Sequence, residues 1–483
     1  MLDEDTLEPS DAQRRTIYAL ATAPGPSGLA VIRVSGPDTR TVLARMVQPV
    51  SRASPAPRTL ARCAIVHPDT GARLDDALVV FFPGPRSYTT EDVLELHVHG
   101  GRAVSAAILA ALEVVPGARP ALPGEFTRRA FEAGRMDLTQ VEGLRDLVSA
   151  RTEAQRRAAL AVASGASRKR YEALRAEIVK CLANVEAVID FGDDEDDVEW
   201  AAFEQARDRA VQLRDNIKAL LADARRGEIL REGVRLALFG PPNAGKSSLL
   251  NFLAQREAAI VTPVPGTTRD VLELELDIGG IPVRVSDTAG LRTTADVVEQ
   301  IGVERARKAV EAANVSLLVL SAPEVFVETP EGPRVEIPDT VQSLINENTF
   351  ILLNKRDLLP ASLSLLPHGG WLVSLTTEQG TLDFMGGFAH ALRKSQLLIT
   401  RRYDFKRDTQ DPDDAPLITH ARHRAHLESA LRFLDAFLTH GPEEIVLGAE
   451  ELRYAAQAVG RISGLIDVED VLDVVFRDFC IGK

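Results

Sequence analysis

The chain has 483 residues, 45% of them hydrophobic, which is too long for one core and predicts about three domains. Its three cysteines, Cys63, Cys181 and Cys480, have no CxxC or Cys/His spacing, which argues against zinc sites and disulfide frameworks and indicates a reducing compartment. The formal net charge of −14 argues against broad, nonspecific nucleic-acid binding, because neutralising phosphates requires a surplus of Lys and Arg.

Residues 1–135 are expected to form an α+β domain. Short strands are predicted at GLAVIRV (28–34) and DALVVFF (76–82), and a helix near VSAAILAALEVV (104–115). The first fifteen residues, MLDEDTLEPSDAQRR, lack both the apolar centre of a signal peptide and the basic character of a transit peptide. No apolar run reaches the roughly eighteen residues of a membrane span, so none is expected.

A long segment without proline, between Pro123 and Pro241, predicts long helices. Residues 136–230 are therefore assigned to the first part of a helical domain. Thr139 and Glu142 form a candidate capping box at its start, and the acidic stretch 191–200 is expected to separate two helical runs.

An α/β domain is predicted at residues 231–398. The spacing of apolar residues changes from helical to extended at GVRLALFG (233–240), and short apolar runs then alternate with helix-like or loop segments. These runs are PVRVS (282–286), VSLLVL (315–320), FILL (350–353) and WLVSL (371–375). The charged residues 399–416 are interpreted as a linker, and 417–483 as the second part of the helical domain. This order predicts an α/β domain inserted into a helical one.

A phosphate-binding loop is predicted at GPPNAGKSS (240–248), which matches GxxxxGK[ST] between a strand and a helix. In such a loop the backbone N–H groups surround phosphates, the lysine reaches the outer phosphates and the following hydroxyl binds Mg²⁺. The predicted nucleotide-binding residues here are Asn243, Ala244, Gly245, Lys246, Ser247 and Ser248, with Ser247 as a Mg²⁺ ligand.

Two further segments are candidates for contacts with the terminal phosphate. DTAG, comprising Asp287, Thr288, Ala289 and Gly290, follows a strand, where an Asp can hold the magnesium shell and a Gly can donate its N–H. The alternative is an ordinary strand-to-turn Asp. In PGTTRD (265–270), Thr268 is the candidate to complete Mg²⁺ coordination when GTP is bound; its alternative is a simple turn.

Recognition of guanine is predicted at NKRD, which contains Asn354, Lys355 and Asp357. A carboxylate there accepts from the N1–H and amino group of guanine, which adenine does not offer. Ser374, with Leu375 and Thr376, is an imperfect match to the remaining base-contacting loop. Three motifs in this order predict a GTPase.

Leu291 follows DTAG where Ras-type enzymes carry a water-orienting Gln, so another group must orient the water.

The whole chain resembles the MnmE/TrmE family of tRNA modification GTPases. The resemblance rests on the GTPase motifs and on three stretches outside them: SYTTEDVLELHVHGG (87–101), GEFTRRAFEAGRMDLTQVEGLRDLV (124–148) and the terminal CIGK. It implies a multidomain fold, with an α+β folate-binding and dimerising domain and an all-α domain interrupted by a Ras-like P-loop GTPase domain. It also implies GTP hydrolysis that serves modification of the wobble uridine at C5.

The resemblance further implies a potassium ion in the place of an arginine finger. Its ligands map to Asn243, Thr262, Val264 and Thr267. The group that orients water maps to Glu299, for which an exposed helix carboxylate is the alternative.

For the tetrahydrofolate derivative, expected to be methylenetetrahydrofolate, the matching positions are Arg33, Glu95, Arg135 and Lys483. The family usually has Lys where this chain has Arg135. Cys480 is expected near the modification centre, although a small buried hydrophobe is the alternative reading of a cysteine. His97 and His99 share a strand face with Glu95 and are expected near the folate pocket.

The expected partners are a second copy of this chain, a flavoprotein of the MnmG/GidA type that carries FAD, and tRNA. The competing function is a regulatory or ribosome-assembly GTPase. The resemblance favours the mitochondrial matrix, with a fungal type of member, and leaves a bacterial cytoplasm as the alternative. It does not specify whether the added group is carboxymethylaminomethyl or taurinomethyl.

Overall fold

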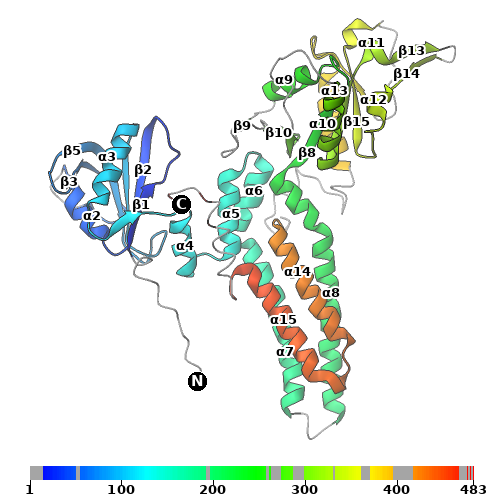
Figure 1. Cartoon of the computed structure of the whole chain (residues 1–483). Coiled ribbons are helices and arrows are strands. Elements are labelled where there is room, and N and C mark those ends of the chain that lie inside the picture. The colour runs from blue at the N-terminus through cyan, green and yellow to red at the C-terminus, as the bar shows by residue number, and fades with distance from the viewer. Residues whose placement is uncertain are drawn as a thin grey trace. The chain divides into compact units, whose positions relative to one another are not determined.

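The computed structural model describes residues 15–50, 55–191, 196–256, 260–262, 273–286, 299–329, 332–359, 370–394, 417–466, 476, 479 and 482 (Figure 1). The chain divides into two compact units. One contains residues 1–145 and 463–483, and the other contains 146–462. The last segment of the chain therefore belongs with the N-terminal unit, whereas the sequence assigned it to the helical domain.

A seven-stranded sheet forms the centre of the first unit, in the order β3-β4-β5-β6-β2-β1-β7. All neighbours are antiparallel except β1 and β7, which are parallel. The strands are β1 (Thr16–Leu20), β2 (Ser27–Ser35), β3 (Val47–Pro49), β4 (Ala61–Val66), β5 (Arg73–Phe82), β6 (Val93–Gly100) and β7 (Ala118–Pro120). Helices α2 (Thr39–Met46) and α3 (Arg102–Glu113) pack on the sheet. The predicted strands and the helix near 104–115 are confirmed.

Alternation along the central strands divides their side chains between two faces. Leu94, Leu96 and Val98 of β6 are buried in the core with Ile32 and other apolar side chains. Glu95 and His97 occupy the opposite face. The register pairs Arg33 of β2 with Glu95 of β6, so two residues distant in sequence lie side by side.

The end of the chain packs inside this first unit. Phe476 and Phe479 form a small apolar cluster with Leu138 and Val141. Gly482 has a φ of +99°, and a Cβ there would lie 2.2 Å from the carbonyl oxygen of Leu20. Only glycine fits so close to β1 in this conformation.

Helix α4 (Glu125–Glu132) is held by a buried charge network. The Arg129 guanidinium donates to both carboxylate oxygens of Glu91 at 3.0 Å and to Glu125 Oε1 at 3.1 Å. Because Arg129 is only 8% exposed, its charge requires these partners. The network fixes α4 against the loop between β5 and β6.

The start of helix α5 (Leu138–Ser149) differs from the sequence prediction. Asp137, not Thr139, caps it: Asp137 Oδ1 accepts from the Gln140 N–H at 2.8 Å, and Gln140 Oε1 accepts from the Asp137 N–H at 3.1 Å. The Thr139 hydroxyl donates to Asp137 instead. The proposed Thr139/Glu142 capping box is therefore wrong. A reciprocal pair of an acid and an amide makes the equivalent two bonds two residues earlier, to the N–H groups of residues 137 and 140.

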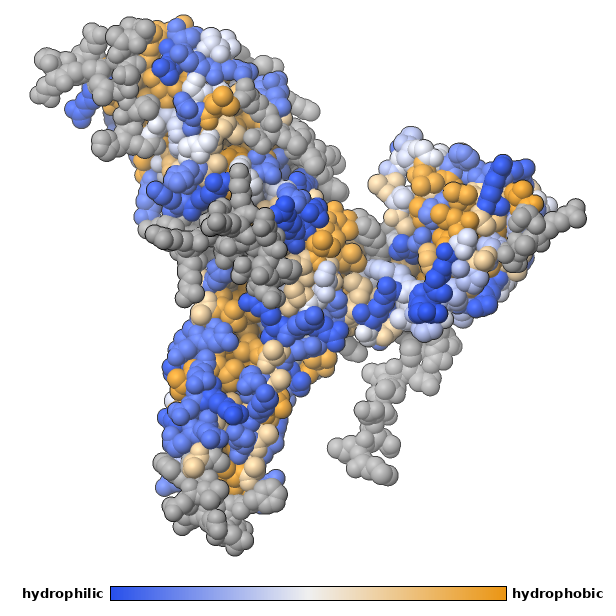
Figure 2. Space-filling view, turned by 180° about the vertical axis from the view of Figure 1, so that it is seen from behind, coloured by the Kyte–Doolittle hydropathy of each residue, from blue (hydrophilic) through white to orange (hydrophobic). Residues whose placement is uncertain are grey.

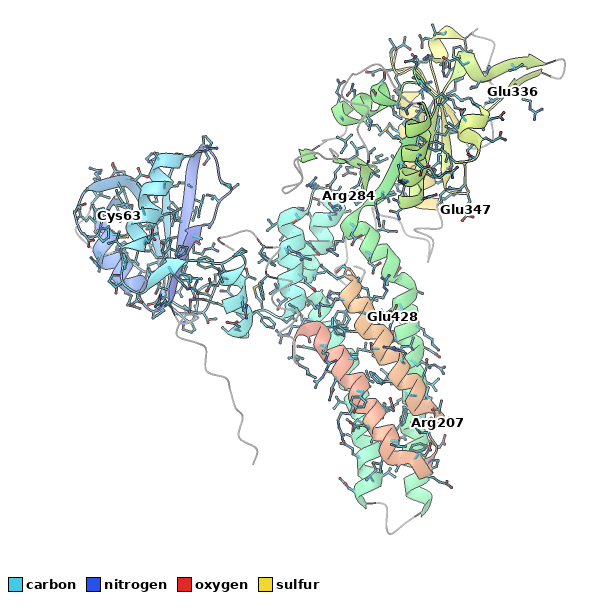
Figure 3. All side chains as sticks on the ribbon, viewed as in Figure 1. Cys63, Arg207, Arg284, Glu336, Glu347 and Glu428 are labelled. Carbon is cyan, nitrogen blue, oxygen red and sulfur yellow. The ribbon has the colours of Figure 1, made fainter. Side chains whose placement is uncertain are left out.

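Long helices dominate the second unit, as the absence of proline predicted. They are α6 (Glu153–Ala163), α7 (Ala166–Phe191), α8 (Asp196–Glu232), α14 (Ala421–Thr439) and α15 (Ile445–Ser463), with a short 3₁₀ turn at Pro442–Glu444. Buried side chains of α7 and α8 share one apolar core with those of α14 and α15. Arg207 of α8, labelled in Figure 3, donates to the carbonyls of Leu438 and His440 at the end of α14. The helices before and after the α/β part thus form one helical domain.

A second seven-stranded sheet has the order β16-β15-β12-β8-β11-β10-β9, and its strands come from the part of the chain between helices α8 and α14. Its strands are β8 (Val234–Phe239), β9 (Ile260–Thr262), β10 (Glu273–Ile278), β11 (Ile281–Ser286), β12 (Val315–Ser321), β15 (Thr349–Asn354) and β16 (Gly370–Leu372). Strand β10 is antiparallel to its neighbours, and the others pair in parallel. The helices are α9 (Lys246–Arg256), α10 (Glu299–Ala312), α11 (Ala322–Val325), α12 (Asp339–Gln342) and α13 (Thr381–Lys394), with a 3₁₀ turn at Arg356–Leu358. The predicted inserted α/β fold is confirmed.

A small hairpin between β12 and β15 was not anticipated. Strands β13 (Phe326–Thr329) and β14 (Gly332–Val335) pair antiparallel and form a separate two-stranded sheet. Its only sequence signal is a Pro-Glu-Gly turn between two short runs.

A charged cluster joins the β10–β11 hairpin to the start of the helical segment. Glu275 of β10 pairs with Arg151, which precedes α6, at 2.6 Å, and with Arg284 of β11 at 2.9 Å (Figure 3). Nearby, Ala154 of α6 and Ile229 of α8 belong to the same apolar core as the hairpin. The nucleotide-type domain therefore packs directly on two helices of its host.

Hydrophobic and hydrophilic residues are mixed over the surface in Figure 2, with hydrophobic residues gathered on the visible side of the N-terminal unit. Apolar side chains exposed in that unit include Leu29, Leu60, Leu78 and Leu122. Among the residues that the structure describes, no helix has the length and apolar character needed to cross a membrane.

Candidate functional site

The phosphate-binding loop lies between β8 and α9. Gly245 has a φ of +104°, and a Cβ on it would lie 2.1 Å from Asn354 Nδ2. The glycine therefore permits both the turn and the close approach of Asn354. Lys246, Ser247 and Ser248 open helix α9, where backbone N–H groups point out of the helix end and favour an anion.

The Lys246 side chain lies across this loop. Its ammonium donates to the carbonyl oxygens of Gly240 at 2.8 Å and Pro241 at 2.7 Å. Burial lowers its pKa, because desolvation disfavours the charged form. Neighbouring phosphate oxygens would offset that cost. This lysine and the N–H groups at the helix end form a donor set that fits a polyphosphate.

Asn354 links three motifs that are far apart in the sequence. It lies at the end of β15, is 5% exposed, and donates from Nδ2 to the Ala244 carbonyl at 3.0 Å. Its Oδ1 accepts from the Leu375 N–H at 3.2 Å. Asn354 is thus part of the frame that joins the phosphate-binding loop to the base-contacting loops.

The remaining predicted base-contacting residues surround this frame. Ser374 is fully buried, and its Oγ accepts from the Thr377 N–H at 3.1 Å. Lys355 adopts a left-handed backbone, with φ +67°, and its ammonium lies 3.5 Å from Glu324 Oε1. Asp357, in the following 3₁₀ turn, is exposed. Its carboxylate is therefore accessible to a base, as the guanine prediction requires.

A second cluster of predicted residues lies on the N-terminal sheet. Glu95 Oε1 accepts from Arg33 Nε at 3.0 Å and from Arg33 Nη2 at 2.9 Å. The Arg33 Nη1 group donates to the Gly482 carbonyl at 3.5 Å. These contacts bring together two predicted folate-binding residues and the residue that precedes the predicted ligand Lys483.

The ring of Tyr88 lies close to two predicted cationic ligands. The guanidinium carbon of Arg33 is 5.2 Å from the Tyr88 ring centroid, and that of Arg135 is 5.6 Å from it. Arg33 is also 5.7 Å from the Phe126 ring. Burial raises the pKa of Tyr88, opposed by its hydrogen bond with Thr127 and by the two positive charges.

His97 and His99 have separate surroundings. His97 Nε2 lies 3.4 Å from Glu95 Oε2, adjacent to the Arg33–Glu95 pair. His99 Nδ1 lies 2.7 Å from Asp75 Oδ1, and its ring is largely exposed. Both histidines line a surface pocket of about 320 Å³ together with Leu29 and Leu78.

Two family models match this chain. A model of the MnmE helical domain matches residues 138–480, and one of the GTP-binding protein TrmE N-terminus matches residues 16–135. The chain belongs to the MnmE/TrmE family.

Relatives in this family are similar over nearly their whole length. The tRNA modification GTPase MnmE of Parvibaculum lavamentivorans is 48% identical over 97% of this chain and 100% of the relative. The mitochondrial 5-taurinomethyluridine tRNA synthase subunit GTPB3 of Danio rerio is 45% identical over 97% of this chain and 93% of the relative. Its Homo sapiens counterpart is 42% identical over 98% of this chain and 94% of the relative.

Several residues that the nucleotide-binding motifs or the MnmE/TrmE resemblance implicate lie outside the described residues. They are Val264, Thr267, Thr268, the DTAG residues 287–290, Cys480 and Lys483. Thr262 lies in β9 and Glu299 begins α10, but their side chains are not among those described. Their roles remain predictions.

Sequence reasoning assigned no role to three residues of the N-terminal cluster. Tyr88, Phe126 and Thr127 occur within the stretches that carry the family resemblance, yet single aromatic residues there have no diagnostic spacing. Only the fold brings the loop after β5 and helix α4 together with Arg33.

Proposed function

We propose that this chain is the GTP-hydrolysing component of a system that modifies the wobble uridine of tRNA at C5. The observation that carries the proposal is the pair of hydrogen bonds made by the Asn354 side chain. They join Ala244 of the phosphate-binding loop to Leu375 of the predicted base-contacting loop. The Arg33–Glu95 pair, with the contact of Arg33 to the Gly482 carbonyl, supports a second function beyond GTP hydrolysis. The names of the relatives agree with this combination.

In this proposal, Lys246 and the N–H groups at the start of α9 bind the phosphates, while Asp357 selects guanine. Mg²⁺ would be held by Ser247 and Thr268, and it neutralises charge that develops on the phosphate oxygens. Asp287 and Gly290 would contact the magnesium shell and the terminal phosphate. Glu299 would orient the attacking water, in place of the glutamine that is absent here.

We also propose that K⁺ binds through Asn243, Thr262, Val264 and Thr267. No arginine finger is identified in the sequence, and a positive charge near the phosphates is worth a large rate factor. We expect GTP hydrolysis to be at least about tenfold faster in KCl than in NaCl at the same ionic strength. Initial rates of phosphate release measure this. Equal rates in the two salts would remove potassium from the mechanism.

For the N-terminal site we propose that Arg33, Glu95, Arg135 and Lys483 bind a methylenetetrahydrofolate, which supplies one carbon for the new bond. Arg135 and Lys483 bring positive charge that suits the glutamate of this ligand. Cys480 would lie near the modification centre. We further propose that the chain forms a homodimer and acts with an FAD-carrying flavoprotein of the MnmG type.

The relatives include bacterial and mitochondrial proteins. We propose the mitochondrial matrix as the compartment, with a bacterial cytoplasm as the alternative. The carboxymethylaminomethyl and taurinomethyl groups are the two candidate products.

Nucleoside analysis of tRNA tests the function. Cells lacking this protein should lose the C5-modified wobble uridine, and the wild-type gene should restore it, whereas a Lys246→Ala variant should not. Mass spectrometry of digested tRNA measures the loss and identifies the group. Unchanged tRNA nucleosides together with defective ribosomal subunits would instead support the ribosome-assembly alternative.

A further inference from the structure

Two arginines near the Tyr88 ring use their guanidinium groups differently. Arg33 donates to Glu95 through Nε and Nη2 and to Gly482 through Nη1. For Arg135, by contrast, the guanidinium makes no hydrogen bond or ion pair with the described residues, and it lies over the Tyr88 ring. The Arg135 charge is thus oriented without its donors being used.

The Tyr88 ring is held in place by its neighbours. Tyr88 lies in the loop between β5 and β6, and its hydroxyl is 2.8 Å from Thr127 Oγ1 of α4. Thr127 and its neighbour Phe126 are fully buried. Because α4 is held by the Arg129 network, the Tyr88 ring has a rigid support at its hydroxyl end.

A ring is well suited to hold an arginine that must bind an anion. A carboxylate partner would orient Arg135 but would neutralise its charge and occupy its N–H groups. The face of an aromatic ring attracts the guanidinium through its quadrupole and leaves the five N–H donors available.

We propose that Tyr88 is a positioning residue that orients the Arg135 guanidinium toward the anionic glutamate end of the folate ligand. This inference rests on the proposed folate function. In it, Tyr88 contributes to the selection of ligands that carry the negatively charged tail.

Two ligands separate the contribution of the glutamate tail to affinity from that of the rest of the ligand: tetrahydrofolate, and tetrahydropteroate, which lacks the glutamate. The affinity of the full-length protein for each is measured by calorimetry under anaerobic conditions. We expect Arg135→Ala to weaken tetrahydrofolate binding about tenfold, because hydrogen bonds to charged groups are lost. Tyr88→Leu should weaken it about fivefold, while its effect on tetrahydropteroate should be small.

A double-mutant cycle isolates the coupling. The Tyr88→Leu/Arg135→Ala variant should bind tetrahydrofolate as Arg135→Ala does, since the ring then has no guanidinium to position. Tyr88→Phe should restore most of the affinity because it keeps the ring. Arg40→Ala is the matched control. Arg40 of α2 also lies over a ring, that of Phe81, but it pairs with Asp92, which precedes β6, and its loss should leave both affinities unchanged.

The outcomes separate the two hypotheses. Additive losses in the cycle, or an equal loss for both ligands in Tyr88→Leu, would overturn the positioning role while leaving folate binding intact. A wild-type protein that binds neither ligand would overturn the folate function and this inference with it. If Tyr88→Leu does not fold, as judged by circular dichroism, Tyr88→Met fills similar volume without an aromatic ring and replaces it in the cycle.

Discussion

GTP hydrolysis should fall by about two to three orders of magnitude when Lys246 is replaced by alanine, because one preorganised cationic donor is removed from the phosphates. In the structure the ammonium is already directed into the loop by the carbonyls of Gly240 and Pro241. Phosphate release under saturating GTP measures the rate, and binding of a fluorescent guanine nucleotide measures the affinity.

The matched control is Lys308→Ala, since Lys308 lies on α10 of the same domain and is 75% exposed. It removes an equal charge and should leave the rate unchanged. Thermal unfolding checks that the Lys246 variant is folded. Burial lowers the pKa of Lys246, so its charged form opposes folding below that pKa, and alanine should not reduce stability by that route. A Lys246→Ala protein that hydrolyses GTP at the wild-type rate would contradict the phosphate-binding assignment.

A change of base specificity is expected for Asp357→Asn. The exposed carboxylate can accept two hydrogen bonds from guanine, whereas an amide presents one donor group and one acceptor. Affinity for guanine nucleotides should fall about a hundredfold or more, because a site built for specific hydrogen bonds strongly rejects a mismatch. Xanthine carries a carbonyl where guanine has its amino group, so the amide should pair with it and xanthosine triphosphate should become the better substrate.

Competition between the guanine and xanthine nucleotides for binding to the purified protein measures this change in base preference. Glu347→Gln makes the same acid-to-amide change at an exposed position before β15 and should not alter the preference (Figure 3). Retention of guanine preference by Asp357→Asn would mean that another residue reads the base. Loss of binding to both nucleotides would point to a disturbed 3₁₀ turn after Lys355, which unfolding measurements can detect.

Local motifs predicted where the phosphate-binding loop lies, because such a loop is a continuous stretch between one strand and one helix. GPPNAGKSS lies between β8 and α9 as expected. The helix cap shows the limit of such patterns. Thr139/Glu142 fitted the capping-box sequence, but Asp137 and Gln140 make the two bonds. Both pairs have the spacing of a capping box, so the spacing alone does not decide at which of the two positions the helix begins.

The amino-acid sequence alone indicated the family, the inserted arrangement and the candidate residues for binding phosphates and guanine, since these depend on short segments and on their order. Tertiary structure alone decided which distant residues meet. Strand register sets Arg33 against Glu95, Asn354 reaches the Ala244 carbonyl, and Tyr88 lies beside both arginines. Such contacts depend on how strands pair and how α4 packs, and no local spacing encodes them.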